Sequence, residues 1–270
     1  MNPRSGGGKV EAFDLVARAE ALGARVELLV GDADVVAMAI KAVRDGADLL
    51  GAAGGDGTQA LVAKVAADHG VAFVCVPAGT RNHFALDLGL DRDDPAAALD
   101  ALGDDAVGAL ADLAEVSGRP FVNNVSMGVY AKVVQSDAYR DDKVGTFADM
   151  LPDLVGPDSE PFDLRCLTPA GPVEGPELLM VSNNPYRFTT LADFGTRDRI
   201  DTGHLGVLVA QVDSAPAAAQ LVRLSAIGAV ERYEGWQTFT ATELEVTSES
   251  GRIEAGIHGE AVVLDSPAEF

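Results

Sequence analysis

The 270-residue chain has few cysteines, few aromatic side chains (6%) and few basic residues. Its two cysteines, Cys75 and Cys166, lie far apart in apolar stretches without zinc-type spacing, so we predict two buried free thiols. Lysine and arginine number 20 against 42 aspartates and glutamates, which gives a formal net charge of −22. Such a chain is not expected to bind nucleic acid broadly through phosphates, or to carry a polybasic membrane anchor.

Long hydrophobic runs are also missing. No run approaches the ~18–20 apolar residues that a transmembrane helix needs, and the Gly-rich first residues lack the apolar core of a signal peptide. We therefore expect a cytoplasmic protein. The hydrophobic content of 47% excludes a disordered chain, and the length allows one large domain or two ordinary ones.

Helical and strand-like patterns alternate over the first hundred residues. Apolar residues recur at helical spacing in 10–22, 33–44 and 58–69, between strand-like runs at 25–30, 47–52 and 71–76. This alternation predicts a doubly wound α/β domain over residues 1–110, with a parallel sheet covered by helices. In such sheets ligands bind at the carboxyl ends of the strands.

The pattern changes to mainly strands from about residue 107. We expect strands at 110–116, 120–125, 162–167, 177–182, 205–212, 236–247 and 252–257, with helices at 146–155 and 216–227. Many strands with few helices predict an antiparallel β-sandwich domain over residues 111–270.

The most specific motif is Gly54-Gly55-Asp56-Gly57-Thr58, between an apolar strand and a helix. Glycines there allow positive φ and let a phosphate approach the amide N–H groups, and the helix N-terminus adds partial positive charge. Asp56 could hold a metal-bound water or orient a hydroxyl. The alternative is a tight turn in which Asp56 only caps the helix.

Two further Gly-containing loops precede predicted helices. Residues 2–9 read Asn-Pro-Arg-Ser-Gly-Gly-Gly-Lys and lack the Walker spacing. Residues 77–85 read Pro-Ala-Gly-Thr-Arg-Asn-His-Phe-Ala and offer several hydrogen-bond donors. Three such loops in one sheet domain are more specific than any one of them.

In this order the three loops resemble the diacylglycerol kinase catalytic family, which includes bacterial diacylglycerol kinases and the sphingosine and ceramide kinases. Residues 121–128, 182–185, 201–205 and 258–260 extend the resemblance over nearly the whole chain. The resemblance implies a nucleotide domain, a β-sandwich domain, and a cleft between them for ATP, Mg²⁺ and a lipid hydroxyl.

The resemblance also implies roles for single residues. Asp56 matches the family's essential aspartate, assigned to nucleotide binding, to the ATP-bound Mg²⁺ or to hydroxyl activation, and Glu260 matches a candidate general base. The predicted nucleotide contacts are Asn2, Arg4, Ser5, Gly6, Lys9, Gly54, Gly55, Gly57, Thr58, Gly79, Thr80 and Asn82. Asp201, with Asp193 and Asp198, is a candidate ligand of a structural Mg²⁺; the alternative is turn-forming aspartates.

The chain departs from the family pattern in three places. The family's first loop follows a β-strand, whereas Asn2 directly follows Met1, so we expect the parallel sheet to lack its first strand and to expose its edges. His83 stands where many relatives have aspartate. His258 also replaces an aspartate, next to the proposed base Glu260, whose charge it could tune.

Taken together, the motifs predict an ATP-dependent kinase that phosphorylates a hydroxyl of diacylglycerol or a related lipid by direct, Mg²⁺-assisted transfer. Membrane contact is expected to be peripheral and transient. One alternative is a soluble-substrate kinase of the NAD kinase type, which shares the Gly-Gly-Asp-Gly loop, although residues 77–89 follow the lipid-kinase pattern. Another is a non-catalytic nucleotide-binding or regulatory module.

Overall fold

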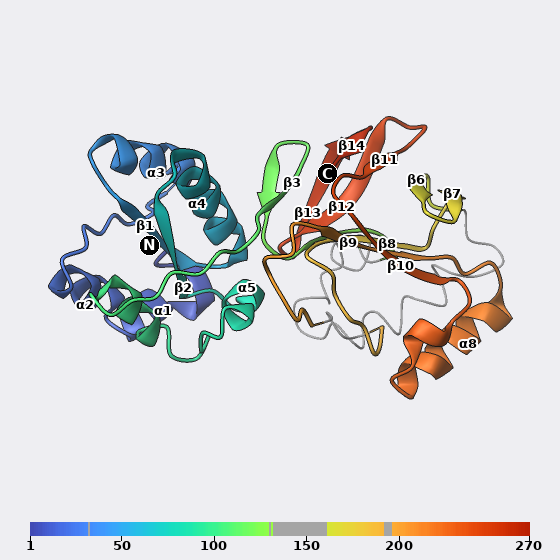
Figure 1. Ribbon diagram of the computed structural model, residues 1–270, viewed down its shortest axis with the longest axis horizontal. Coiled ribbons are helices and arrows are strands. Elements are labelled where there is room, and N and C mark those ends of the chain that lie inside the picture. The colour runs from blue at the N-terminus through green and yellow to red at the C-terminus, as the bar shows by residue number, and fades with distance from the viewer. Residues whose placement is uncertain (32, 130, 132–160, 192–195) are drawn as a thin grey trace. The chain divides into compact units, whose positions relative to one another are not determined.

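The structure, a computed structural model, describes residues 1–31, 33–129, 131, 161–191 and 196–270 (Figure 1). The chain divides into two compact units. Unit 1 comprises Met1–Leu113 and Pro120–Asn123, and unit 2 comprises Ala114–Arg119 and Asn124–Phe270. Within the described residues, no helix has the length and apolar character needed to cross a membrane.

Unit 1 alternates short helices with two strands. Its elements are η1 (Ser5–Gly7), α1 (Lys9–Ala12), α2 (Leu15–Ala21), α3 (Val35–Arg44), β1 (Leu49–Gly54), α4 (Asp56–His69), β2 (Ala72–Pro77), α5 (His83–Asp87) and η2 (Ala97–Leu102). The helix predicted over 10–22 is confirmed, but it is divided into α1 and α2 at Asp14, which has a φ of 51°.

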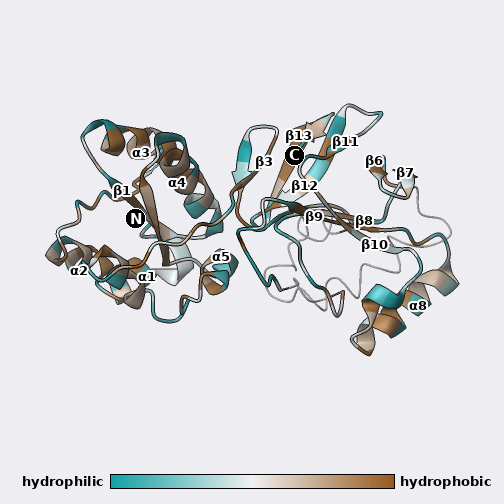
Figure 2. Ribbon diagram, viewed as in Figure 1, coloured by the Kyte–Doolittle hydropathy of each residue, from teal (hydrophilic) through white to brown (hydrophobic). Residues whose placement is uncertain are grey.

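Strands β1 and β2 form a parallel pair in which Leu49 lies opposite Ala72 and Gly54 opposite Pro77. Figure 2 colours much of β1 brown, as expected for a strand of leucine and alanine. Side chains alternate between the two faces of a strand, so this sheet buries apolar groups on both sides.

Both faces of the pair are covered by helices. One apolar cluster joins β1 to α3 and α4, with buried members Ala39, Leu50, Ala52, Val62, Val65 and Ala66. A second cluster joins β1 and β2 to α1, α2 and η2, with buried members Val10, Leu15, Ala19, Ala53, Val74, Val76, Ala78, Ala98 and Leu99. The predicted parallel sheet covered by helices is therefore confirmed.

Residues 25–30 differ from the prediction, because they are not a strand. They are tied to the first residue of the chain: the amino group of Met1 donates to the carbonyl of Glu27 (2.7 Å), and the N–H of Leu29 donates to the carbonyl of Met1 (2.9 Å). On the other side, the N–H of Asn2 donates to the carbonyl of Ala53 at the end of β1 (2.8 Å).

Unit 2 is built on two antiparallel sheets. The larger sheet has the order β10-β9-β8-β5-β12-β13 and the smaller sheet has the order β14-β11-β6-β7. The strands of the larger sheet are β5 (Asn124–Gly128), β8 (Leu178–Asn183), β9 (Leu205–Ala210), β10 (Trp236–Ala241), β12 (Arg252–Ile257) and β13 (Glu260–Asp265). Those of the smaller sheet are β6 (Arg165–Thr168), β7 (Gly171–Glu174), β11 (Glu245–Thr247) and β14 (Ala268–Glu269).

The remaining elements of unit 2 follow the predicted plan. Helix α8 (Ala215–Ala226), expected at 216–227, is capped by the Ser214 hydroxyl, which accepts from the N–H of Ala217. Its Leu221 is buried in a cluster with Phe188 and Trp236, near the short helix η4 (Val230–Arg232). A separate pair, β3 (Ala114–Val116) and β4 (Arg119–Phe121), precedes β5, and Pro120 and Phe121 of β4 belong to unit 1. The predicted helix at 146–155 lies outside the described residues. The antiparallel class predicted for this part of the chain is confirmed.

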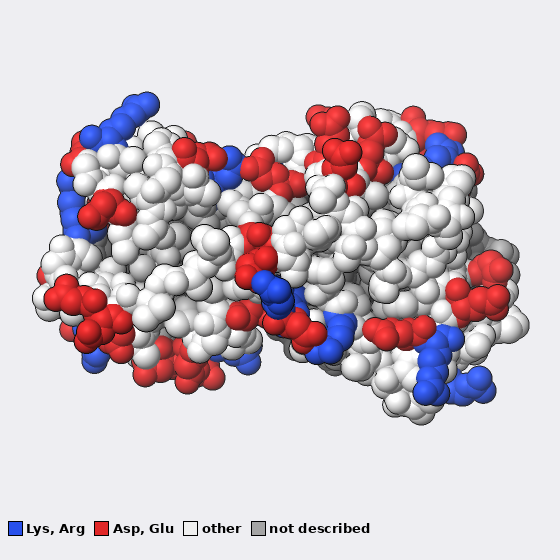
Figure 3. Space-filling view, viewed as in Figure 1, with Lys and Arg blue, Asp and Glu red and all other residues white. Residues whose placement is uncertain are grey.

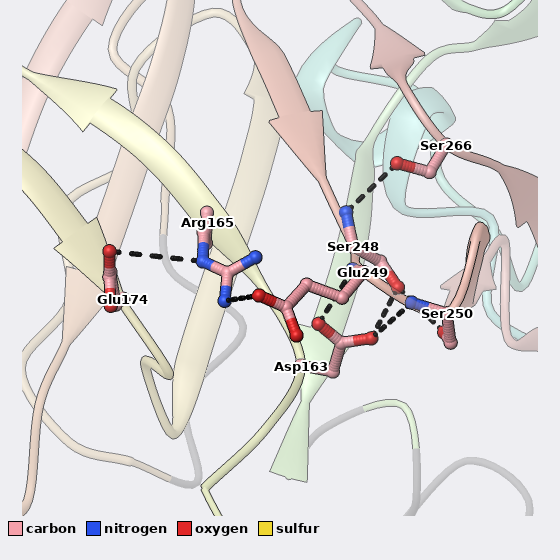
Figure 4. Close-up of polar contacts among 7 residues, drawn as sticks. All are labelled: Asp163, Arg165, Glu174, Ser248, Glu249, Ser250 and Ser266. Carbon is pink, nitrogen blue, oxygen red and sulfur yellow. Dashed lines mark hydrogen bonds and ion pairs between the residues drawn. The ribbon is translucent and has the colours of Figure 1, made fainter.

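Asp163 ties the beginning of the smaller sheet to the turn after β11 (Figure 4). Its carboxylate accepts from the Ser248 hydroxyl (2.7 Å) and from the N–H groups of Glu249 and Ser250 (both 2.8 Å). These hydrogen bonds favour the charged form, so they hold the pKa of Asp163 well below its usual range. Nearby, Arg165 pairs with Glu249 at 2.6 Å.

The acidic composition is visible at the surface. On the face drawn in Figure 3, aspartate and glutamate side chains cover more area than lysine and arginine. Each unit also contains one buried cysteine, Cys75 in β2 and Cys166 in β6, and both thiols are free as predicted.

Candidate functional site

The first Gly-rich loop reverses the chain with three consecutive residues in the left-handed region. Gly6, Gly7 and Gly8 have φ values of 55°, 71° and 90°. A Cβ atom at Gly6 would lie 2.5 Å from the carbonyl oxygen of Ala78, so this position also requires glycine for space. The first loop therefore packs directly on the third loop.

The second loop uses its glycines differently from the prediction. None of Gly54, Gly55 and Gly57 has a positive φ, and Gly55 is extended with φ −83° and ψ 172°. The backbones of the second and third loops instead approach each other closely. A Cβ atom at Gly79 of the third loop would lie 2.5 Å from the Cα atom of Gly55. The missing side chains thus let the second and third loops touch through their backbones.

Asn82 joins the same two loops from the other direction. Its side chain is 1% exposed, and its Nδ2 donates to the carbonyl of Gly54 at 2.8 Å. Its φ of 47° places it in the left-handed region, which asparagine tolerates better than most residues. Asn82, a predicted nucleotide contact, therefore also links the start of α5 to the carboxyl end of β1.

Asp56 lies at the first position of α4, where it is only 8% exposed. Its carboxylate accepts from the N–H of His83 (3.2 Å) and of Phe84 (3.3 Å), at the start of α5. The negative charge is thus near the positive ends of two helices. Burial, and secondarily the Asp56 charge, raise the pKa of the Cys75 thiol far above its usual range. Asp56 caps α5 rather than its own helix, whose N-cap is Gly55.

Gln59 is a site residue that the motif reading missed. It is fully buried one turn after Asp56, and its Nε2 donates to the carbonyls of Gly54 (3.2 Å) and Val76 (3.3 Å). Gln59 thereby bridges the carboxyl ends of β1 and β2. A signal was present in the sequence, because a glutamine three residues after Asp56 lies on the buried face of α4.

The basic and hydroxyl side chains of the predicted site have separate contacts within unit 1. Arg4 donates to the carbonyl of Gly31 (3.3 Å) and Lys9 to the carbonyl of Arg92 (2.6 Å). Thr58 lies beside Gly54, where an added Cβ would be 3.2 Å from the Thr58 Cβ. The N–H of Ser5 donates to the carbonyl of Asn2, and Thr80 is exposed. Unit 1 therefore gathers the three loops at one end of its sheet.

Glu260, the predicted base, lies in unit 2 as the exposed first residue of β13. It faces Ile257 across a hairpin whose turn residues, His258 and Gly259, have φ values of 52° and 80°. Burial lowers the pKa of His258 to about 4, so this ring is neutral at pH 7 and brings no positive charge to its neighbour.

The predicted structural Mg²⁺ ligand Asp201 is engaged by a cation of the protein. Both of its carboxylate oxygens accept from Arg199, at 2.8 and 3.0 Å. Asp198 pairs with Arg187, and Asp193 lies outside the described residues. The part of the chain that the structure describes contains no group of three or more metal-ligating side chains.

Comparison with known proteins agrees with the loop geometry. Residues 1–114 match the family model described as "Diacylglycerol kinase catalytic domain". The resemblance predicted from the three loops is therefore confirmed over unit 1. This match supports a kinase of a lipid kinase family, and kinase catalytic domains in general use ATP.

The whole chain has the fold of solved structures from Bacillus anthracis strain Sterne. One, provisionally named a diacylglycerol kinase, is 20% identical with a TM-score of 0.71, and the match covers 99% of this chain and 91% of that chain. Another, titled a diacylglycerol kinase, is 19% identical with a TM-score of 0.71, and covers 99% and 90%. At this identity the likeness establishes the two-part fold.

Proposed function

We propose that this protein is an ATP-dependent lipid kinase, which transfers the γ-phosphoryl group of ATP to a hydroxyl of diacylglycerol or a related lipid. The observation that carries the proposal is the meeting of three Gly-rich loops around Asp56 at the carboxyl ends of β1 and β2. Ligands of parallel α/β sheets bind at this end of the strands.

The loops suit a polyphosphate. A Cβ atom at Gly7, Gly8 or Gly55 would have no neighbour within 4 Å, so the backbone is open on that side. Peptide N–H groups in left-handed turns and at helix N-termini are good donors to phosphate oxygens. In this proposal Asn2, Ser5, Gly6, Thr58, Gly79, Thr80 and Asn82 join them as nucleotide contacts. Arg4 and Lys9 add local positive charge to an otherwise acidic chain.

Asp56 is the proposed partner of the metal that accompanies ATP. Its two oxygens accept amide hydrogens from α5, which fixes the carboxylate where the three loops meet. Carboxylate and water are the oxygen ligands that Mg²⁺ prefers. Bound there, Mg²⁺ would offset the charge that develops on the transferring phosphoryl group.

Glu260 is the proposed general base. A lipid alcohol is a weak nucleophile, and a carboxylate within hydrogen-bond reach accelerates transfer by taking its proton. Glu260 is exposed at the end of a two-residue hairpin turn, where a substrate hydroxyl has access to it. The phosphoryl group passes directly from ATP to the lipid, and no covalent enzyme intermediate is required.

The test is transfer of label from γ-radiolabelled ATP to a total lipid extract. We expect one labelled lipid with wild type and none with Asp56→Asn, since asparagine removes the charge and keeps one of the two oxygens that accept from the α5 amides. Asp68→Asn is the matched control, because Asp68 lies in the same helix, exposed and paired with Lys64. This control should keep full transfer.

The outcomes separate the alternatives. Chromatography of the product identifies the lipid. Label transferred to NAD instead of lipid would contradict the proposal in favour of a soluble-substrate kinase. ATP binding without transfer to any acceptor would instead support a nucleotide-binding module.

A further inference from the structure

Two buried amide side chains converge on one backbone carbonyl at the end of β1. The carbonyl of Gly54 accepts from Asn82 Nδ2 at 2.8 Å and from Gln59 Nε2 at 3.2 Å. Gln59 Nε2 also donates to the carbonyl of Val76, near the end of β2, at 3.3 Å. Because every partner is a carbonyl oxygen, each amide must present its NH2 group to the backbone.

The oxygen atoms of the same two amides have no partner. Gln59 is fully buried and Asn82 is 1% exposed, and within the described residues no donor reaches Gln59 Oε1 or Asn82 Oδ1. Burial of an unpaired amide oxygen lowers stability. Packing therefore does not explain why two amides lie at this point, whereas the backbone group that their NH2 groups hold does.

The held carbonyl determines where the next N–H points. Gly54 and Gly55 share one trans peptide, in which the C=O and N–H bonds point in opposite directions. Since the two amides draw the carbonyl toward themselves, the Gly55 N–H points away from them. Among the described residues no group accepts its hydrogen, and a Cβ atom at Gly55 would have no neighbour within 4 Å. This N–H is therefore open to a ligand, beside the first turn of α4.

A peptide between two glycines flips easily. Neither glycine has a Cβ atom, so rotation about ψ of Gly54 and φ of Gly55 meets little steric resistance. A flip would carry φ of Gly55 from −83° into the positive region, which glycine accepts and other residues do not. The Gly54 carbonyl would then stand where the Gly55 N–H stood. A site that attracts an anion through this N–H would repel it after the flip.

We propose that Gln59 is a positioning residue for the phosphates of ATP, which acts with Asn82 to keep the Gly55 N–H directed toward the nucleotide. The proposal rests on the proposed function in one respect, namely that ATP binds at the three loops. Gln59 is fully buried, so its effect passes through the peptide that it holds. A donor that is fixed before ATP arrives costs no reorganisation on binding.

The experiment is a double-mutant cycle, measured by calorimetric titration with Mg²⁺ and ATP. Gln59→Met keeps the length of the side chain and removes the NH2 group, and Gly55→Ala disfavours the positive φ that the flipped peptide needs. We expect Gln59→Met to weaken ATP binding about three- to tenfold, as for one net hydrogen bond. In a chain that already carries Gly55→Ala, the same substitution should weaken binding by less than about twofold, whatever Gly55→Ala costs by itself.

Val62→Ala is the control for a general loss of stability. Val62 lies one turn further along α4 and is also buried. This substitution should lower Tm and leave ATP affinity at the wild-type value, measured at a temperature at which every variant is folded. Gln59→Met should have the opposite effect, with a Tm close to wild type, because it also removes an unpaired oxygen, and with weaker ATP binding.

Two results would overturn the proposal. One is an unchanged ATP affinity in Gln59→Met, and the other is an equal loss with and without Gly55→Ala, which would leave Gln59 a structural role alone. Wild type that bound no ATP would instead contradict the proposed function. The positioning role is then decided by crystal structures of wild type and Gln59→Met: a Gly54 carbonyl that flips in the variant supports it, and one that keeps its direction in both overturns it.

Discussion

The two units position their proposed functional residues in different ways. In unit 1 the proposed site rests on three loops that touch through their backbones, at one end of a two-stranded sheet. In unit 2 Glu260 is carried by a hairpin in which six residues of β12 pair with six of β13. Unit 1 should therefore be sensitive to side-chain atoms added where the loops touch, and unit 2 to the loss of polar contacts and turn residues.

The sharpest test of this contrast is Gly79→Ala. The new Cβ would lie 2.5 Å from the Cα of Gly55, a backbone collision that neither loop can relieve by turning a side chain. We expect unit 1 to lose its fold and all kinase activity, measured by limited proteolysis and by label transfer, while fragments of unit 2 stay protected.

Gly55→Ala is the matched control on the facing loop. No atom lies within 4 Å of its Cβ position, and its φ of −83° suits alanine. Tm should stay within a degree or two of wild type, and only ATP affinity should fall. Equal stability of the two variants would show that the loops are not held by this contact.

The second prediction concerns Glu260→Gln. If Glu260 removes the proton of the lipid hydroxyl, the substitution should lower kcat by about 10²–10⁴-fold with little change in the KM for ATP. Tm should not change, because the side chain is exposed. Glu254→Gln, on the opposite strand of the same hairpin and also exposed, is the control that should keep wild-type kcat. A kcat within twofold of wild type would remove Glu260 from the mechanism.

The third prediction concerns a substitution that should destabilise unit 2 and leave unit 1 unchanged. Asp163→Ala removes the acceptor of three hydrogen bonds from residues 248–250 (Figure 4). We expect faster hydrogen exchange in β6 and β11 and a lower Tm, with exchange in β1 and β2 unchanged. Asp198→Ala, which removes an exposed ion pair with Arg187, should leave exchange in both units as it was. A uniform change across the two units would contradict the division.

The smallest expected effect is a pH dependence from His258. Its folded pKa is about 4, below the ordinary value of 6.5, so the unfolded chain takes up this proton first as the pH falls. Stability is therefore lost between pH 6.5 and about 4. His258→Asn should not show that loss, and it creates the Asn-Gly pair that such turns favour. Parallel curves of Tm against pH for the two proteins would refute this reading.

Much of the fold could be predicted from local sequence patterns. The helix expected at 33–44 is α3, and the strand–turn–helix around the Gly-Gly-Asp-Gly-Thr motif appears as β1 and α4. These segments combine a clear period with turn residues at their ends, so local preference and tertiary packing agree. In unit 2 the strands expected at 177–182 and 252–257 coincide closely with β8 and β12.

The sequence-based predictions failed where contacts between distant parts of the chain determine the structure. The stretch 236–247 has the apolar content of one strand, yet it divides into β10 and β11, which belong to different sheets. Residues 25–30 have strand-like composition, but a strand needs a partner, and the described one is Met1 alone. The roles of Gly55 and Gly79 were also hidden, because mutual approach of two loops leaves no trace in either loop's own pattern.

The two cysteines, one in each unit, make the units separately observable. Cys75 is 4% exposed in β2 and Cys166 is 6% exposed in β6, and burial raises the pKa of both thiols, that of Cys166 to about 11. A thiol that is buried and protonated reacts with an alkylating reagent only when the surrounding structure opens. The labelling rates of the two thiols therefore report the opening of each unit in the intact chain, without any introduced probe.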